Sequence, residues 1–190
     1  MRSISLALAA SALLAIACGP EEPEVLTDPT LPIEVPTAGT AAPPVVTVVT
    51  AQTFVDDAAA GGTFEVRLGR VAQRNGASAD VREFGAMMVA DHTAAGNTLR
   101  TLARELDLEL ATDLPEEREE SLVRVNALTG ATFDREYILV MVEDHQKAVD
   151  LFERATTAEI DPRLQEFARS TLPVLSRHLQ RAQQIQATLQ

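Results

Sequence analysis

Apolar and small side chains recur every three or four positions over most of the chain after residue 50, which predicts helices rather than strands. Four such segments are long: residues 51–75, 79–107, 132–158 and 162–189. Asn75-Gly76 is a typical helix end, and Asp161-Pro162 is a typical helix start. The run Val45–Val49 could pass for a strand, but it has no second strand to pair with, so we assign it to the preceding linker.

The connections between these helices differ in length, and this difference predicts the topology. Short loops join the first helix to the second and the third to the fourth, whereas residues 108–131 separate the second from the third. Within that link, Pro115 precedes four closely spaced glutamates, which favours a short helix ending near Thr129. We therefore predict an all-α, ferritin-like four-helix bundle with a short extra helix in its crossover. An up-and-down meander with a decorated loop is the alternative.

The three histidines of the chain each fall on the apolar stripe of a different long helix. They are His92, His145 and His178, and the remaining long helix carries Glu65 on its stripe. All four lie near the middle of their helices, so we predict that they meet in one buried layer. Two interpretations are open, because buried polar groups need partners: a hydrogen-bonded network with Glu65 ionised against a protonated histidine, or the ligand set of a single copper, iron or zinc ion.

Further side chains would surround such a metal site. The polar candidates are Asp91, Tyr137, Glu143 and Asp144. Met88 and Met141 stand one helical turn before His92 and His145; thioether ligands would favour copper(I), although methionine is also an ordinary core residue. The Glu-x-x-His pairs of di-iron proteins are missing from the sequence, since the residues three positions before the histidines are Val89, Val142 and Leu175. A di-iron oxidase or iron store is therefore not expected.

Residues 1–17 have the pattern of a bacterial secretory signal. Arg2 precedes an apolar run from Ile4 to Ala17 that is too short to cross a bilayer. The following Cys18 completes the sequence Ala-Ile-Ala-Cys, which resembles a lipobox, so we expect Cys18 to carry lipid; simple cleavage that leaves a free cysteine is the alternative. In lipoproteins of this kind, Gly19 rather than Asp after the cysteine implies the outer membrane, with the domain facing the periplasm.

Residues 18–50 predict a tether between the lipid and the helices. This segment holds seven of the ten prolines and has neither lysine nor arginine. Because repeated proline removes backbone donors and blocks helices, we expect an extended, solvated chain. The expected organisation is a signal peptide at 1–17, the lipidated cysteine and tether at 18–50, and the bundle at 51–190.

Charge and composition exclude several functions. The net charge of -12 argues against nucleic-acid binding, and a single cysteine excludes an internal disulfide framework. The sequence contains no HExxH, P-loop or GxGxxG motif. We therefore expect a non-enzymatic module anchored in the membrane through Cys18, whose acidic and arginine-rich face would meet another envelope protein. That same composition is also typical of any solvated helix surface.

Several motifs together resemble the domain-of-unknown-function family 4142. They are Phe54-Val55 with Ala58–Gly62, Glu65-Val66 with Leu68-Gly69, Phe84–His92, Phe133–Tyr137 with Asp144-His145, and Leu172-Pro173 with His178-Leu179. The resemblance covers residues 51–190. It implies a ferritin-like bundle in the bacterial cell envelope and no settled activity.

Overall fold

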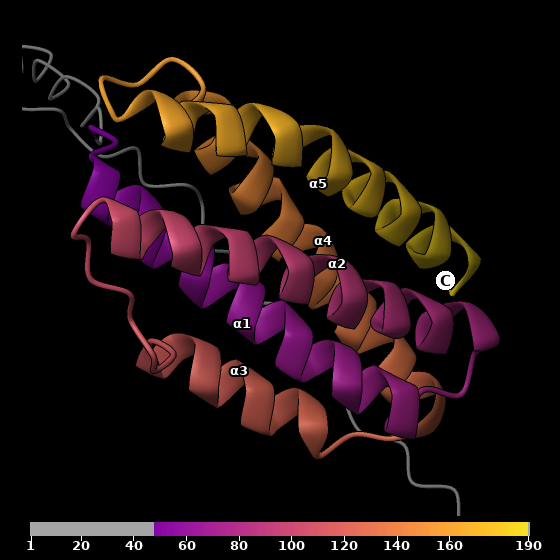
Figure 1. Cartoon of the computed structure of the whole chain (residues 1–190). Helices are drawn as coiled ribbons and strands as arrows, with labels where there is room; N and C mark the ends of the chain where they lie inside the picture. The colour runs from indigo at the N-terminus through magenta and orange to yellow at the C-terminus, as the bar shows by residue number, and fades with distance from the viewer. Residues whose placement is uncertain (1–47, 190) are drawn as a thin grey trace, which may run out of the picture. The chain divides into compact units, whose positions relative to one another are not determined.

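Five helices make up the part of the chain that the structure, a computed structural model, describes, residues 48–189 (Figure 1). They are α1 (Ala51–Asn75), α2 (Ala79–Glu105), α3 (Glu116–Asn126), α4 (Gly130–Ala155) and α5 (Pro162–Thr188). Their number and order confirm the predicted four long helices and one short one. The predicted signal peptide, Cys18 and most of the tether lie outside the described residues. Among residues 48–189, no helix combines the length and apolar character that crossing a bilayer requires.

The helix starts show why these segments begin where they do. The Thr50 hydroxyl accepts the backbone N–H of Thr53, and the Thr53 hydroxyl accepts that of Thr50, so two amides at the start of α1 have partners. Asp161 accepts the backbone N–H of Arg163 at 2.9 Å and starts α5 as predicted. Ser78 precedes α2, but its side chain makes no capping hydrogen bond.

A buried carboxylate from α4 takes over this capping role at the α1–α2 loop. The two oxygens of Asp134 accept the backbone N–H groups of Ala77 and Ser78 at 2.9 and 2.8 Å. Gly76 and Gly130 also pair through their backbones in an isolated bridge. The start of α4 is therefore fixed beside the end of α1 and the start of α2.

This placement decides the topology. Since α4 begins where α2 begins, the two helices run in the same direction, and the connection must return along the length of the bundle. The helix α3 makes this return, packed against α1 and α4 (Figure 1). At its far end, the Asn75 side chain donates to the carbonyls of Asn126 and Leu128. The result confirms the ferritin-like crossover and excludes the meander, in which α4 would begin beside the end of α2.

Within each hairpin the helices pack closely, most of all α1 on α2. A Cβ atom on Gly69 would lie 2.6 Å from the carbonyl oxygen of Gly85, and one on Gly85 would lie 2.7 Å from the carbonyl oxygen of Gly69. Only glycine permits this approach. Two apolar clusters fill the bundle, one around Phe84 and Tyr137 and the other around Phe54 and its neighbours. The predicted polar layer lies between them.

Candidate functional site

The four long helices bring Glu65, His92, His145 and His178 together, each at most 7% exposed. The imidazole ring centroids lie 5.4, 5.5 and 5.6 Å apart, close to an equilateral triangle. Phe84 of α2 packs against the rings of His145 and His178, with centroid distances of 6.2 and 6.4 Å. One side chain from each long helix thus contributes to a single buried cluster at mid-height.

Two of the histidines have one ring nitrogen held by an acceptor outside the triangle. Nδ1 of His145 donates to the backbone carbonyl of Met141 at 2.9 Å. Because a carbonyl oxygen only accepts, the proton must be on Nδ1. Nε2 of His178 lies 2.9 Å from Oδ2 of Asp91, whose side chain is 44% exposed. These contacts fix which nitrogen of each ring faces the centre.

Glu65 plays the same part for the third histidine. Its Oε2 lies 2.9 Å from Nδ1 of His92, and its Oε1 lies 3.3 Å from Nδ1 of His145. Two roles for Glu65 were predicted as alternatives: the ionised partner of a histidine, or a fourth metal ligand beside the three imidazoles. The structure places its carboxylate against the Nδ1 atoms of both His92 and His145, and not against the unpartnered Nε2 atoms.

The other nitrogen of each ring has no partner. These atoms are Nε2 of His92, Nε2 of His145 and Nδ1 of His178, all buried and with no hydrogen-bond partner among the described residues. One ligand atom from each histidine lies within 4.8 Å of the others. A buried nitrogen without a partner typically costs about 1–3 kcal/mol, so a purely structural network would carry three such costs at one point.

The charges of the cluster follow from burial and proximity. Burial raises the pKa of Glu65, but the neighbouring His92 and His145 outweigh it and lower the pKa to about 2. Burial lowers the pKa of His92, and the contact with Glu65 more than compensates, so that it is raised overall. Burial lowers the pKa of His145, and that of His178 falls to about 4. At neutral pH two of the imidazoles are therefore neutral, with a lone pair on the unpartnered nitrogen.

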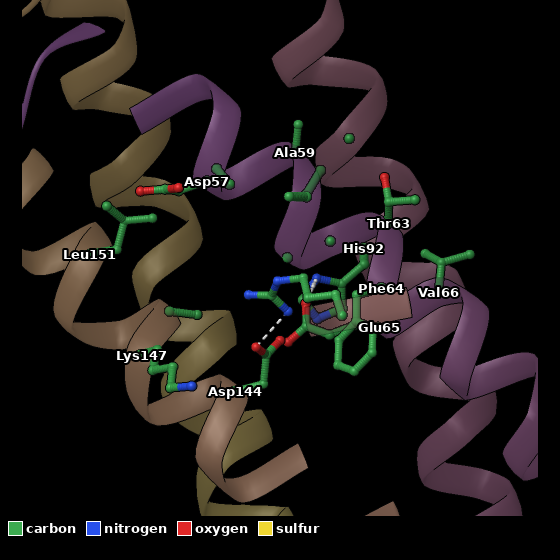
Figure 2. Close-up of a pocket in the computed structure, with 18 of the residues that line it drawn as sticks. Asp57, Ala59, Thr63, Phe64, Glu65, Val66, His92, Asp144, Lys147 and Leu151 are labelled. Carbon is green, nitrogen blue, oxygen red and sulfur yellow. Dashed lines mark hydrogen bonds and ion pairs between the residues drawn. The ribbon is translucent and has the colours of Figure 1, made fainter. Parts of the chain in front are cut away.

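A pocket of about 1120 Å³ reaches the cluster from one side. Glu65, His92 and Asp144 of α4 form part of its wall (Figure 2). Arg118 of α3 also lines it. Nη1 of Arg118 donates to Oδ1 of Asp144 at 2.6 Å, and its guanidinium lies 5.0 Å from the centre of the Phe64 ring. Burial and the charge of Glu65 raise the pKa of Asp144 to about 7, against the lowering effect of Arg118.

The other predicted neighbours are distributed around the cluster in different ways. Met141 contacts His145 through its carbonyl, and Met88 is a fully buried core residue on the same side of α2 as Gly85. Tyr137 is buried, stacks on Phe133 and contacts Phe84 edge-on, and its hydroxyl has no partner among residues 48–189. Glu143 is exposed and lines the pocket.

Arg118 was not among the residues predicted to lie near the site. The sequence did contain an indication of its role, because Arg118 is the only cation among the four glutamates at the start of the short helix. A lone arginine in such a run is a candidate for an inward-facing ion pair. Its partner could not be foreseen, since that depends on how α3 lies against α1 and α4.

These observations define the class of protein: a ferritin-like helical bundle with a buried layer of one glutamate and three histidines. Residues 35–185 match the family described as Domain of unknown function (DUF4142). The chain belongs to this family, as its motifs predicted. Comparison with curated proteins gives no match.

Two solved structures share the fold. One is a DUF305 protein of Streptomyces coelicolor, with a TM-score of 0.62 and 12% identity over 72% of this chain and 91% of that chain. The other is a DUF305 fragment of Deinococcus radiodurans, with a TM-score of 0.65 and 13% identity over 75% of this chain and 99% of that chain. At such low identity the similarity supports the helical fold alone.

Proposed function

We propose that the domain binds one transition-metal ion through His92, His145 and His178. The observation that carries this proposal is that three buried imidazoles each have one nitrogen without a partner and can bring one ligand atom each within 4.8 Å of the others. Ligand atoms around a shared zinc ion lie about 3.3 Å apart, given bonds of about 2.0 Å, so the three nitrogens must close by up to about 1.5 Å on binding. The proposal requires side-chain rotations of the three histidines to close this gap.

The acceptors behind the histidines support the same proposal. Metal-binding histidines usually donate their other N–H to a carboxylate or a backbone carbonyl, which orients the ring and makes it a stronger ligand. Glu65, the Met141 carbonyl and Asp91 stand in these positions. The two carboxylates also balance the charge of a divalent ion bound to three neutral imidazoles. A hydrogen-bonded network would need neither three free nitrogens nor two acids.

Imidazole ligands suit copper, zinc and iron, and for one nitrogen site the affinity order favours copper(II) over zinc and iron(II). The test measures metal content in the full chain carrying Cys18→Ser, which removes the competing thiol, purified in detergent and dialysed against each metal in turn. We expect one ion per chain, tightest for copper(II). His145→Gln and His178→Gln should each abolish this binding, while circular dichroism verifies that the variants remain helical.

Asp91→Asn is the matched variant, because the half-buried Asp91 orients His178 without being a ligand itself. We expect a loss of about 10–100-fold in affinity, as for other residues that orient a metal-binding histidine. A wild-type chain that retains no metal, or histidine variants that bind as well as wild type, would leave only the structural network.

We also propose that the protein is a lipoprotein of the cell envelope. The support is the Cys18 lipobox at the end of an apolar segment, followed by a proline-rich stretch. Mass spectrometry of the mature N-terminus should find acyl chains on Cys18, and Cys18→Ser should release the protein from outer-membrane fractions. An unmodified cysteine would contradict the anchor without affecting the metal site.

A further inference from the structure

Two buried carboxylate oxygens beside the histidine triangle have no hydrogen-bond partner. They are Oε1 of Glu65 and Oδ2 of Asp144, on side chains that are 2% and 7% exposed. Both residues line the pocket, and in Figure 2 the carboxylate of Asp144 points toward Glu65 and His92. The negative charge of Glu65 also helps to raise the pKa of Asp144, after the larger effect of burial. Because each acid keeps one buried oxygen without a hydrogen bond, the pair favours a cation that both oxygens can bind.

The cation beside Asp144 is the guanidinium of Arg118, and the proposal requires this side chain to move. Arg118 pairs with Asp144 through one nitrogen, yet it remains 24% exposed and comes from the short crossover helix rather than from the four-helix core. Its guanidinium passes Gly61, where a Cβ atom would lie 3.7 Å from Nη2. The small residues of α1 at this point leave room for the arginine to swing outward into the pocket.

We propose that Glu65 Oε1 and Asp144 Oδ2 form a capture site at which a divalent metal ion replaces Arg118 before it passes to the three histidines. This inference rests on the proposed function, since it supplies the route to the same metal. It assigns a binding role to Asp144 and a displaceable role to Arg118.

The residues present can perform both steps, capture by the carboxylates and transfer to the imidazoles. A hydrated divalent ion exchanges water readily for carboxylate oxygens, which hold it without the deep desolvation that an apolar channel would demand. The other oxygen of Glu65, Oε2, contacts His92, so an ion bound to Oε1 would lie next to one of the three histidines. The imidazoles then bind a transition metal more strongly than the carboxylates do, which gives the transfer its direction.

The experiment follows Cu²⁺ loading of the full chain, with Cys18→Ser throughout, by stopped-flow fluorescence. The chain has one tyrosine and no tryptophan. Phe84 contacts both Tyr137 and His145, so copper bound at the histidines should quench the tyrosine fluorescence. Asp144→Asn should slow loading about tenfold or more, because a local charge that attracts the ion is lost. Arg118→Gln should accelerate loading, because the competing cation is removed. Both variants should still bind one ion at equilibrium.

These opposite effects distinguish a capture site from an ion pair that only holds α3 against the bundle. If the ion pair only held α3 closed, both substitutions would break it and both would speed loading. Arg67→Gln is the matched control, because Arg67 pairs with Glu119 and also ties α3 to α1, but away from the two acids. It should load at the wild-type rate.

Each failure has its own meaning. A wild-type chain that binds no Cu²⁺ at equilibrium overturns the proposed function. Normal binding with an Asp144→Asn rate equal to or faster than wild type overturns the capture site alone. If Asp144→Asn does not fold, Arg118→Gln decides, because loading that is no faster than wild type contradicts the displacement of the arginine.

Discussion

Replacing Glu65 by glutamine tests the electrostatics of the buried layer directly. Glutamine has the same size and keeps one acceptor oxygen for Nδ1 of His92, but it removes the negative charge that sits between His92 and His145. The change therefore isolates charge from packing. It should destabilise the metal-free protein, because a protonated and largely buried His92 loses its counter-ion.

The magnitude follows from the pKa of Glu65, which lies at about 2 in the folded chain against an ordinary value of 4.5. A carboxyl whose pKa is lowered on folding stabilises the fold above its unfolded pKa, and this stabilisation is lost as the pH falls toward the folded value. The fall corresponds to about 3 kcal/mol near neutral pH, of which about 1 kcal/mol remains near pH 3. Glu65→Gln should therefore cost most at pH 7 and progressively less in acid.

The assay is urea unfolding followed by circular dichroism, with a chelator present to exclude metal, on wild type and Glu65→Gln at several pH values. Glu119→Gln provides a control, since this carboxylate pairs with Arg67 at the surface and should contribute less than about 1 kcal/mol. A Glu65→Gln variant that is as stable as wild type at pH 7 would refute the reasoning. So would a difference that stays constant from pH 7 to pH 3.

Three other predictions concern the fold and its ligand. Gly85→Ala should destabilise by about 1–3 kcal/mol in urea unfolding, because its Cβ would lie 2.7 Å from Ala72 Cβ and Gly69 O, whereas Gly96→Ala, with open space around it, should stabilise by up to about 1 kcal/mol. Asp134→Ala should cost about 1–3 kcal/mol and speed hydrogen exchange at the two loop amides that the carboxylate now holds. Copper(II) at a hundredfold excess over its Kd should stabilise the chain by about 2.7 kcal/mol and raise its Tm; an unchanged Tm would contradict binding to the folded state.

The helices were predictable because each depends on local information. The spacing of apolar residues marks the buried face of every long helix, and Thr50, Asp161 and Pro162 satisfy or avoid the open amides at the helix starts. The crossover was predictable from loop length, because a link of two dozen residues with its own helix can return along the bundle. The depth of the three histidines followed from counting residues along each helix at a constant rise.

The chemistry of the site depended on contacts between elements. Periodicity places an imidazole on an inward face, but it does not say which ring nitrogen is free; that depends on Asp91, on the Met141 carbonyl and on Glu65 across the bundle. The same limit left two roles open for Glu65, as a metal ligand or as the partner of a histidine.

Arg118 shows the limit most clearly. It is distant in sequence from Glu65 and Asp144, and its ion pair exists only because α3 returns beside α1 and α4. The amino-acid pattern was sufficient for the helices, their order and the depth of the polar layer, since backbone hydrogen bonding and amphipathicity act over a few residues. The direction of each hydrogen bond, the unpartnered nitrogens and the pocket arose from packing between helices, because side-chain orientation responds to neighbours that the chain brings together only on folding.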